Sequence, residues 1–179
     1  MLSQKDSLIL LVDIQDKLVS ALEKDKITDN AYKIVKAANI LEIPIVVTEQ
    51  YPKGLGNTVE KIKNELNKDT KVFEKTYFNA LLEPEILDTI KSFGKKQIVI
   101  MGIETHICVH QTASALVEQG FEVYAIKDAC ASRNKYEFKQ GIEAMKQNGV
   151  KISCVEIALF EWLKGSKHPN FKEIQALIK

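Results

Sequence analysis

Hydrophobic positions along the chain fall into two alternating patterns. Short, nearly continuous runs occur in SLILLVDI, IPIVVT, KVFEK, KQIVIMGI, FEVYAIKD and VKISCV, near Ser7, Ile43, Val72, Lys96, Phe121 and Val150. Their length and their content of β-branched residues are typical of strands, and runs such as LILLV and IVIM are typical of strands buried on both faces. The pattern predicts six β-strands.

Between these strands, apolar residues recur at helical spacing. This spacing occurs in TDNAYKIVKAANILE, EPEILDTIKSFGKK, THICVHQTASALVEQG and NKYEFKQGIEAMKQNG. Gly94, Gly120 and Gly149 lie where C-terminal caps belong. Because alternating strands and helices form parallel sheets through helical crossovers, we predict an α/β fold. It is a three-layer sandwich of Rossmann-like topology, with a six-stranded, mostly parallel sheet flanked by helices.

The C-terminal segment HPNFKEIQALIK predicts one last amphipathic helix, begun by Pro169. We expect its apolar face to pack on its own domain, with packing on a partner as the alternative. That face consists of Phe171, Ile174, Leu177 and Ile178.

The composition predicts a single domain, residues 1–179. At 179 residues, with 45% hydrophobic and 27% charged content, the chain is long enough to bury one core of its own. Lysine and arginine (25) nearly balance aspartate and glutamate (24), for a net charge of +1, which argues against nucleic acid or a membrane surface as a partner. The expected partner is a small molecule or another subunit.

The sequence also bears on where the protein resides. No run approaches the ~20 apolar residues of a membrane span, and the first residues lack the pattern of a signal peptide. Cys108, Cys130 and Cys154 form neither a CxxC pair nor an even disulfide framework. We therefore expect a soluble, cytoplasmic protein.

Three polar residues close or follow predicted strands. Asp13 ends the first, Lys75 follows the third and Cys108 follows the fourth. Because ligands bind beyond the carboxyl ends of parallel strands, an acid, a base and a thiol are predicted to meet at one edge of the sheet. The alternatives are that Cys108 is a small core residue, Asp13 a helix N-cap and Lys75 a solvated surface charge.

Cys108 falls in the first turn of a helix predicted to start near Glu104 or Thr105. A helix N-terminus stabilises an anion by about 0.3–1 kcal/mol, or ~2 kcal/mol when partly buried, so the dipole alone lowers a thiol pKa by about one unit. We expect the ammonium of Lys75 to lower it further and Asp13 to take the thiol proton. Free backbone N–H groups of this first turn suit an oxyanion.

The motifs LLVDIQDKL, FEKTYFNAL, GIETHICVHQTA and IKDACASR resemble, in the same order, those of the isochorismatase-like cysteine hydrolases. The resemblance covers nearly the whole chain, and VTEQYPKGLG with HPNFKEIQALIK is most similar to the subgroup of isochorismatase domain-containing proteins. It implies a catalytic triad of Asp13, Lys75 and Cys108. It also implies a cis peptide bond between Ile103 and Glu104, and an oxyanion hole formed by the backbone N–H groups of Glu104 and Cys108.

Further residues are predicted to line the substrate pocket, although each could equally serve packing or the surface. They are Gln50, Tyr51, Tyr77, Phe78 and Thr105. If Thr105 caps the helix, its hydroxyl competes with the substrate for the N–H of Cys108, so its role as cap or as substrate ligand stays open.

We expect no metal and no cofactor. Family members that hydrolyse nicotinamide carry a metal site of Asp and His after the second strand, a region without histidine here, and His106 and His110 face away from Cys108 on a helical projection. The first strand–helix turn, DIQDKLVS, has no glycine to admit a dinucleotide.

The sequence thus predicts a metal-independent cysteine hydrolase that cleaves a small amide-like (C–N) or ester substrate through a thioester. The resemblance also implies a homo-oligomer. The alternative is a catalytically silent, oligomeric binding or scaffold protein that retains the fold.

Overall fold

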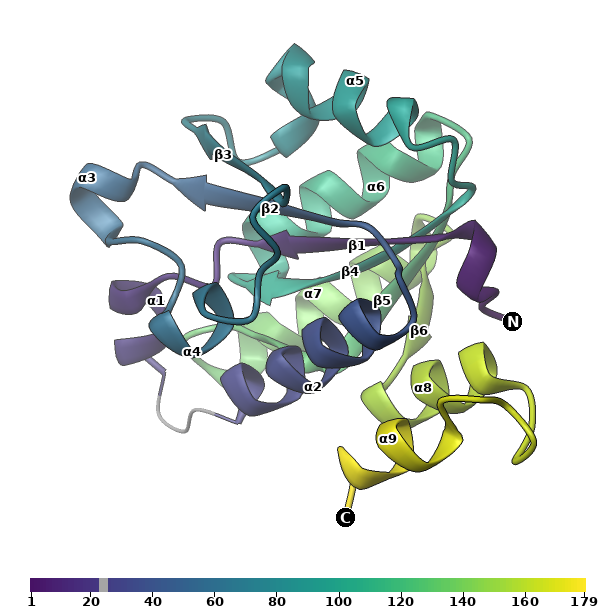
Figure 1. Ribbon diagram of the computed structural model, residues 1–179. Helices are drawn as coiled ribbons and strands as arrows, with labels where there is room; N and C mark the ends of the chain where they lie inside the picture. Colours follow the sequence, from purple (N-terminus) through teal and green to yellow (C-terminus); the bar gives the residue numbers. More distant parts are fainter. Residues whose placement is uncertain (23–25) are drawn as a thin grey trace.

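One parallel sheet organises the chain in a computed structural model, which describes residues 1–22 and 26–179. Its strands are β1 (Ser7–Val12), β2 (Ile45–Gln50), β3 (Lys71–Lys75), β4 (Gln97–Ile103), β5 (Glu122–Ala131) and β6 (Lys151–Ser153). They pair side by side in the order β3-β2-β1-β4-β5-β6, and every pair is parallel (Figure 1). The predicted three-layer α/β fold with six strands is confirmed.

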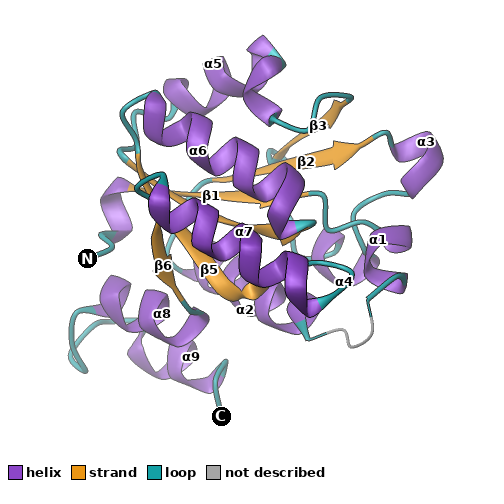
Figure 2. Cartoon of the chain, turned by 180° about the vertical axis from the view of Figure 1, so that it is seen from behind, coloured by secondary structure: helices purple, strands orange, loops and turns teal. Residues whose placement is uncertain are grey.

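Helices cover both faces of this sheet. The α-helices are α1 (Asp16–Ser20), α2 (Ile27–Ile40), α3 (Pro52–Leu55), α4 (Glu60–Lys63), α5 (Pro84–Ser92), α6 (His110–Glu118), α7 (Lys135–Gln147), α8 (Val155–Leu163) and α9 (Phe171–Ala176). Shorter turns are η1 (Gln4–Asp6), η2 (Ala80–Leu82) and η3 (Thr105–Val109). Helix α2 lies on one face, and α5, α6 and α7 lie on the other (Figures 1 and 2). No helix in the described ranges is long and apolar enough to cross a membrane.

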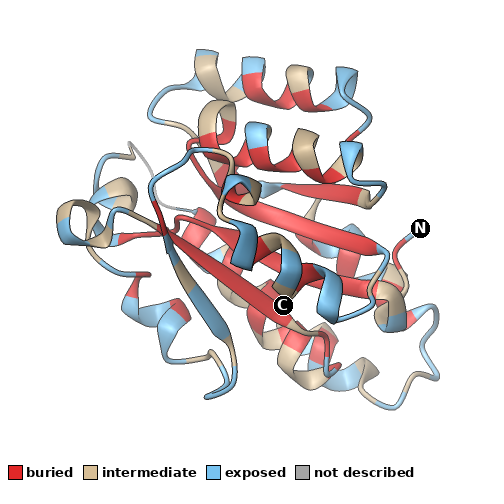
Figure 3. Ribbon diagram, turned by 90° about the horizontal axis from the view of Figure 1, so that it is seen from above, coloured by how far each residue is buried: buried red, intermediate tan, exposed pale blue. Residues whose placement is uncertain are grey.

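The core is the sheet itself, sandwiched between the apolar faces of the helices (Figure 3). Every residue of β1 and of β4 is buried, as expected for central strands with helices on both faces. Strand β3 differs, because it lies at the edge and only its last residue, Lys75, is buried. Of the residues expected at the strand ends, Asp13 and Cys108 therefore follow the buried central strands β1 and β4, and Lys75 ends the exposed edge strand β3.

Several helix boundaries match their sequence signals. Gly94, Gly120 and Gly149 all have positive φ just after α5, α6 and α7, as predicted for C-terminal caps. Helix α9 begins at Phe171, two residues after Pro169, and its apolar residues pack against the core of the same chain. The alternative of a partner-facing α9 is not needed to explain that face.

Helix α8 was not predicted. Its sequence VEIALFEWL is apolar at most positions, and its first residue overlaps the run assigned to the sixth strand. The helix begins where Asp128 Oδ1 accepts a hydrogen bond from the N–H of Val155, at 2.9 Å. This contact comes from β5, far away in sequence, so periodicity alone does not reveal it.

At Gly102 the backbone of β4 lies against the backbone of β1. A Cβ placed on it would lie 2.0 Å from the carbonyl oxygen of Val12, and its φ of +155° is one that side chains rarely adopt. The pairing of β4 with β5 also shifts register between Ile100 and Gly102. A glycine here keeps β1 and β4 close enough for Asp13 and Cys108 to share one site.

We predict that Gly102→Ala destabilises the protein by at least the ~1–3 kcal/mol typical of overpacking, because the rigid backbone of β1 cannot yield to the new methyl group. Urea denaturation of the variant measures this loss. Gly165→Ala is the matched control, since nothing lies within 4 Å of its Cβ position. Equal unfolding midpoints for the two variants would show that β1 and β4 separate at little cost.

Candidate active site

Asp13 and Lys75 form a buried ion pair at the carboxyl ends of β1 and β3. Asp13 Oδ2 lies 2.7 Å from Lys75 Nζ, and both side chains have no exposed surface. Asp13 Oδ1 accepts a second hydrogen bond from the Thr48 hydroxyl at 2.8 Å. Burial raises the pKa of Asp13, an effect that the Lys75 ammonium and the Thr48 hydroxyl partly offset. The two predicted residues are thus brought together from positions 62 apart in sequence.

The ammonium of Lys75 has three oxygen partners. Besides Asp13, its Nζ donates to Gln50 Oε1 at 2.6 Å and to the carbonyl of Tyr77 at 3.2 Å. An ammonium has three protons, so all its hydrogen-bonding capacity is used within the protein. Lys75 therefore acts on its surroundings through its charge and not as a free proton donor.

Cys108 lies in η3, the first helical turn after β4, and is 6% exposed. Helix formation starts at the predicted place, but this turn is a π-helix that continues into α6. Burial raises the pKa of the Cys108 thiol to about 12; the Asp13 carboxylate also raises it, and the Lys75 ammonium lowers it. The predicted low thiol pKa is therefore wrong, because desolvation and the Asp13 carboxylate raise the pKa by more than the Lys75 ammonium lowers it.

The turn between β4 and η3 differs from the expectation in one respect. Among the described residues there is no cis peptide bond, so the bond between Ile103 and Glu104 is trans. The chain changes direction instead through a left-handed conformation at Glu104, with φ of 57°. Asp13 has the same kind of conformation, with φ of 55°, directly after β1. The oxyanion hole of Glu104 and Cys108 N–H groups stays a prediction.

Thr105 is fully buried, and its hydroxyl donates to the carbonyl of Ala131 at 2.8 Å. The side chains on either side of Thr105 also contact residues directly after β5. Glu104 Oε1 lies 2.9 Å from Arg133 Nε, and His106 Nδ1 lies 2.9 Å from Ser132 Oγ. These contacts tie the start of η3 to the end of β5. Thr105 is thereby occupied with the backbone and does not cap the N–H of Cys108.

The other predicted pocket residues divide into two groups. Gln50 lies inside the site, since its side chain accepts from Lys75 and donates to the carbonyl of Thr76 at 2.9 Å. Tyr51, Tyr77 and Phe78 are 58%, 51% and 53% exposed. Tyr51 lines a cavity of about 210 Å³ that also reaches Lys75. Gln50 thus hydrogen-bonds to Lys75 and Tyr51 lines a cavity beside it, whereas the roles of Tyr77 and Phe78 in the pocket stay predictions.

Sequence reasoning missed Gln15 and Thr48. Gln15 is fully buried; its amide donates to the carbonyls of Gln50 and Gly56 at 3.0 and 2.6 Å and accepts from the N–H of Gln50 at 2.7 Å. It fixes the end of β2 beside Asp13. A polar residue three places after a buried strand in LLVDIQ was the available signal. Thr48 carried none, because threonine is common in strands.

Across residues 1–22 and 26–179, no three His, Cys, Asp or Glu side chains are grouped so that they could hold a metal ion. His106 bonds to Ser132, His110 lies 3.3 Å from Asn148, and His168 lies 3.4 Å from Gln4. The histidines are thus engaged in separate places. The described site offers an acid, an ammonium and a thiol, a set suited to nucleophilic chemistry with internal proton transfer.

Comparison with known proteins gives a consistent result. A family model described as "Isochorismatase domain" matches residues 7–157. The chain is 40% identical to isochorismatase family protein 1A of Dictyostelium discoideum, over 98% of this chain and 87% of that protein. It is 37% identical to isochorismatase domain-containing protein 2 of Danio rerio, over 99% and 89% of the two chains.

Solved structures show the same architecture. A structure described as MAR1 ribonuclease from Caenorhabditis elegans has a TM-score of 0.93 and 36% identity, over 99% of this chain and 91% of that one. The YcaC gene product of Escherichia coli, described as an octameric hydrolase of unknown specificity, has a TM-score of 0.88 and 24% identity, over 98% and 94% of the two chains. The second likeness is one of fold.

We predict opposite effects of two substitutions on alkylation of Cys108 by iodoacetamide. Asp13→Asn removes the charge that raises the thiol pKa, so alkylation at neutral pH is faster; Lys75→Met removes the charge that lowers it, so alkylation is slower. In the wild type, with a pKa of about 12, the rate rises roughly tenfold per pH unit up to at least pH ~10. Mass spectrometry of the labelled site follows the rate, with half-buried Cys154 as the reference within each molecule. A wild-type plateau below pH ~9, or the same sign for both variants, would contradict this view of the site.

Proposed function

Because the chain belongs to the isochorismatase family of hydrolases, we propose that it hydrolyses a small amide or ester through a thioester on Cys108. One observation carries the proposal. The buried Asp13 carboxylate, which bonds to Lys75 and Thr48, also raises the pKa of the Cys108 thiol through its charge and a hydrogen bond. A proton acceptor and a nucleophile therefore share one desolvated site.

In the first half-reaction, the sulfur of Cys108 attacks the substrate carbonyl carbon while the thiol proton passes to Asp13. A carbon–sulfur bond forms, and the electron pair of the carbonyl moves to its oxygen. When this intermediate collapses, the carbon–nitrogen or carbon–oxygen bond breaks, and the protonated Asp13 gives its proton to the leaving amine or alcohol. The raised pKa of Asp13 suits this role, since burial favours the protonated carboxyl that the intermediate requires.

In the second half-reaction, water attacks the thioester and Asp13 accepts a proton from it. The tetrahedral intermediate expels the Cys108 thiolate, which takes the proton back, and the carboxylic acid product leaves. The raised thiol pKa of about 12 matters here, because the resting thiol is protonated and transfers its proton only when an electrophile is present.

Lys75 stabilises the negative charge that alternates between Asp13 and Cys108. Its three hydrogen bonds fix the ammonium, so the stabilisation requires no rearrangement during reaction. The backbone N–H groups of Glu104 and Cys108 receive the oxyanion in this proposal. In this proposal, the side chains of Tyr51, Tyr77 and Phe78 contact the substrate.

The proposal includes a cytoplasmic homo-oligomer, in line with the octamer described for the YcaC protein. The name ribonuclease, carried by the structure from Caenorhabditis elegans, suggests phosphodiester cleavage instead. The chemistry of the site supports the acyl reaction better. Lys75 is fully hydrogen-bonded within the protein, so its ammonium is not free to hold a phosphate.

The test is reaction with p-nitrophenyl acetate, followed by acid quench and mass spectrometry. We expect an acetyl thioester on Cys108, with release of nitrophenol, and its turnover at a rate that falls at least 100-fold in Asp13→Asn, in keeping with the usual size of acid–base catalysis. Cys108→Ala should carry no acetyl group in the site, whereas Cys130→Ala should react like the wild type.

A panel of small primary amides and a short RNA, incubated with the same samples, then separates the candidate reactions. Amide turnover that depends on Cys108 supports the proposal. Acetylation to the same extent in wild type and Cys108→Ala refutes the thioester, and RNA cleavage that persists in Cys108→Ala assigns another activity to the chain.

A further inference from the structure

A second cavity lies on the side of β4 away from β1, at the carboxyl ends of β5 and β6. Its volume is about 550 Å³, within the ~300–1,000 Å³ range of small-molecule sites. We call it the β5–β6 cavity; among the residues that line it are Lys127, Asp128, Phe138, Ser153, Cys154 and Ile157. None of these belongs to the site described above.

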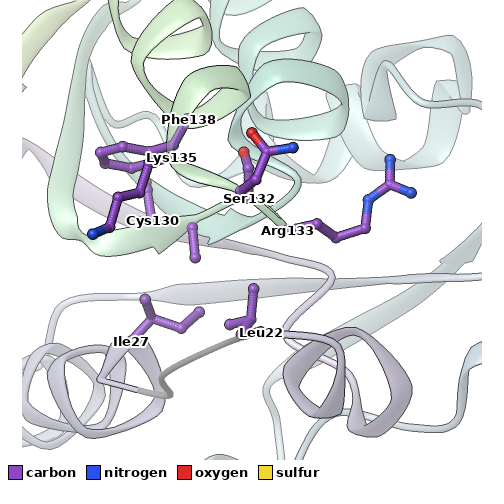
Figure 4. A pocket seen from close by; sticks show the side chains of 9 residues that line it. Leu22, Ile27, Cys130, Ser132, Arg133, Lys135 and Phe138 are labelled. Atoms are coloured by element: carbon purple, nitrogen blue, oxygen red, sulfur yellow. The ribbon is translucent and has the colours of Figure 1, made fainter.

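The cavity continues into two smaller hollows around Phe138. One of about 270 Å³ shares Lys127 and Phe138 with it and adds Lys135 and Lys139. The other, of about 320 Å³, shares Phe138 and is drawn in Figure 4. There Phe138 and Lys135 face Ile27 and Leu22 across the opening. The whole groove therefore combines an apolar floor with cationic side chains.

Charge in this groove is unbalanced. Lys127, Lys135 and Lys139 are exposed, and none forms an ion pair with another described residue. Of the acidic groups nearby, Glu143 pairs with Lys146 at 2.7 Å, and Asp128, which accepts from the N–H of Val155, sets one negative charge against the three ammonium groups. Lys127 lines both the β5–β6 cavity and the neighbouring hollow, and Lys135 and Lys139 line that hollow, so the three ammonium groups favour an anion where the two spaces adjoin.

Ser153 gives an independent indication of a ligand. It is 93% buried, since 7% of its surface is exposed, it lines the cavity, and its hydroxyl finds no hydrogen-bond partner among the described residues. An unsatisfied buried hydroxyl destabilises the folded chain, and a hydrogen bond to a polar atom of a ligand would remove that cost. At the same opening, Ile157 leaves 51% of its surface exposed, although it is a large apolar residue.

We propose that the β5–β6 cavity is a second ligand site, which takes a small molecule with an apolar body and one carboxylate. The apolar body packs on Phe138 and Ile157, and the carboxylate is held by Lys127 and Lys135. The Ser153 hydroxyl bonds to a polar atom of the same molecule. Cys154, which lines the cavity and is half-buried, becomes covered when the ligand binds.

Octanoate is the probe, with 1-octanol as its neutral counterpart. Both are added to the Cys108→Ala protein, which makes the result independent of the thioester chemistry, and the alkylation rate of Cys154 is followed by mass spectrometry. We expect octanoate to slow alkylation of Cys154 at least fivefold at saturation, and octanol to do so only at concentrations about tenfold higher.

Two double variants test the role of charge. Lys127→Ala/Lys135→Ala should raise the octanoate concentration that gives half-maximal protection of Cys154 at least tenfold. Lys96→Ala/Lys172→Ala removes two exposed lysines elsewhere and should leave it unchanged. All four lysines are exposed, so these variants are expected to fold.

Three results would overturn the proposal. They are no protection of Cys154 by octanoate, equal protection by octanoate and octanol, and equal loss of protection in both double variants. A short single-stranded RNA that protects Cys154 at lower concentration than octanoate would also overturn it, since the groove would then be a nucleic-acid site.

Discussion

The ion pair between Asp13 and Lys75 is the contact on which the arrangement of this molecule depends most. It joins the central strand β1 to the edge strand β3 across β2, and Thr48 of β2 donates to the same carboxylate. Breaking a buried pair from one side leaves an unpaired charge and costs about 3–5 kcal/mol. This is a large share of the ~5–15 kcal/mol that holds a typical domain folded. The fold therefore holds the two charges in place at the point where we propose that the reaction takes place.

The ion pair also determines how the thiol behaves. Lys75 lies 2.7 Å from Asp13 and bonds to three oxygen atoms, and burial raises the pKa of the Cys108 thiol more than the ammonium lowers it. A thiol with a pKa of about 12 is a poor nucleophile. In the proposed reaction, Cys108 therefore becomes reactive when its proton moves to Asp13. Such a site is protected against alkylation and oxidation, which act on the thiolate.

Much of the fold was readable from the sequence, and the reason is physical. Hydrophobic runs and helical spacing report burial on two faces or one, which is what distinguishes the strands and helices of an α/β sandwich. The family resemblance drawn from the motifs is confirmed by the match over residues 7–157. Residues at the ends of parallel strands converge, so Asp13 and Lys75 could be placed together before their distance was known.

What the sequence did not reveal depends on contacts between distant segments. The degree of burial of Cys108 decides the direction of its pKa shift, and periodicity gives the face of a helix but not what covers it. The π-turn at η3, the use of the Thr105 hydroxyl by Ala131 and the start of α8 at Asp128 are also set by neighbouring elements. The roles of Gln15 and Gln50 follow from where the end of β2 meets the end of β3.

The position of Lys75 on an edge strand has one more consequence. Strand β3 hydrogen-bonds to β2 on one side only, and its first four residues are not buried. Sheet edges open locally at a lower free energy than the core. Any fluctuation that lifts β3 from β2 removes the ammonium from Asp13, even while β1, β4 and the helices around them stay folded. The fraction of molecules with an intact Asp13–Lys75 pair is thus set by the local stability of the sheet's edge and not by the global stability of the protein. Amide exchange along β3 and loss of the ion pair would therefore report the same local opening.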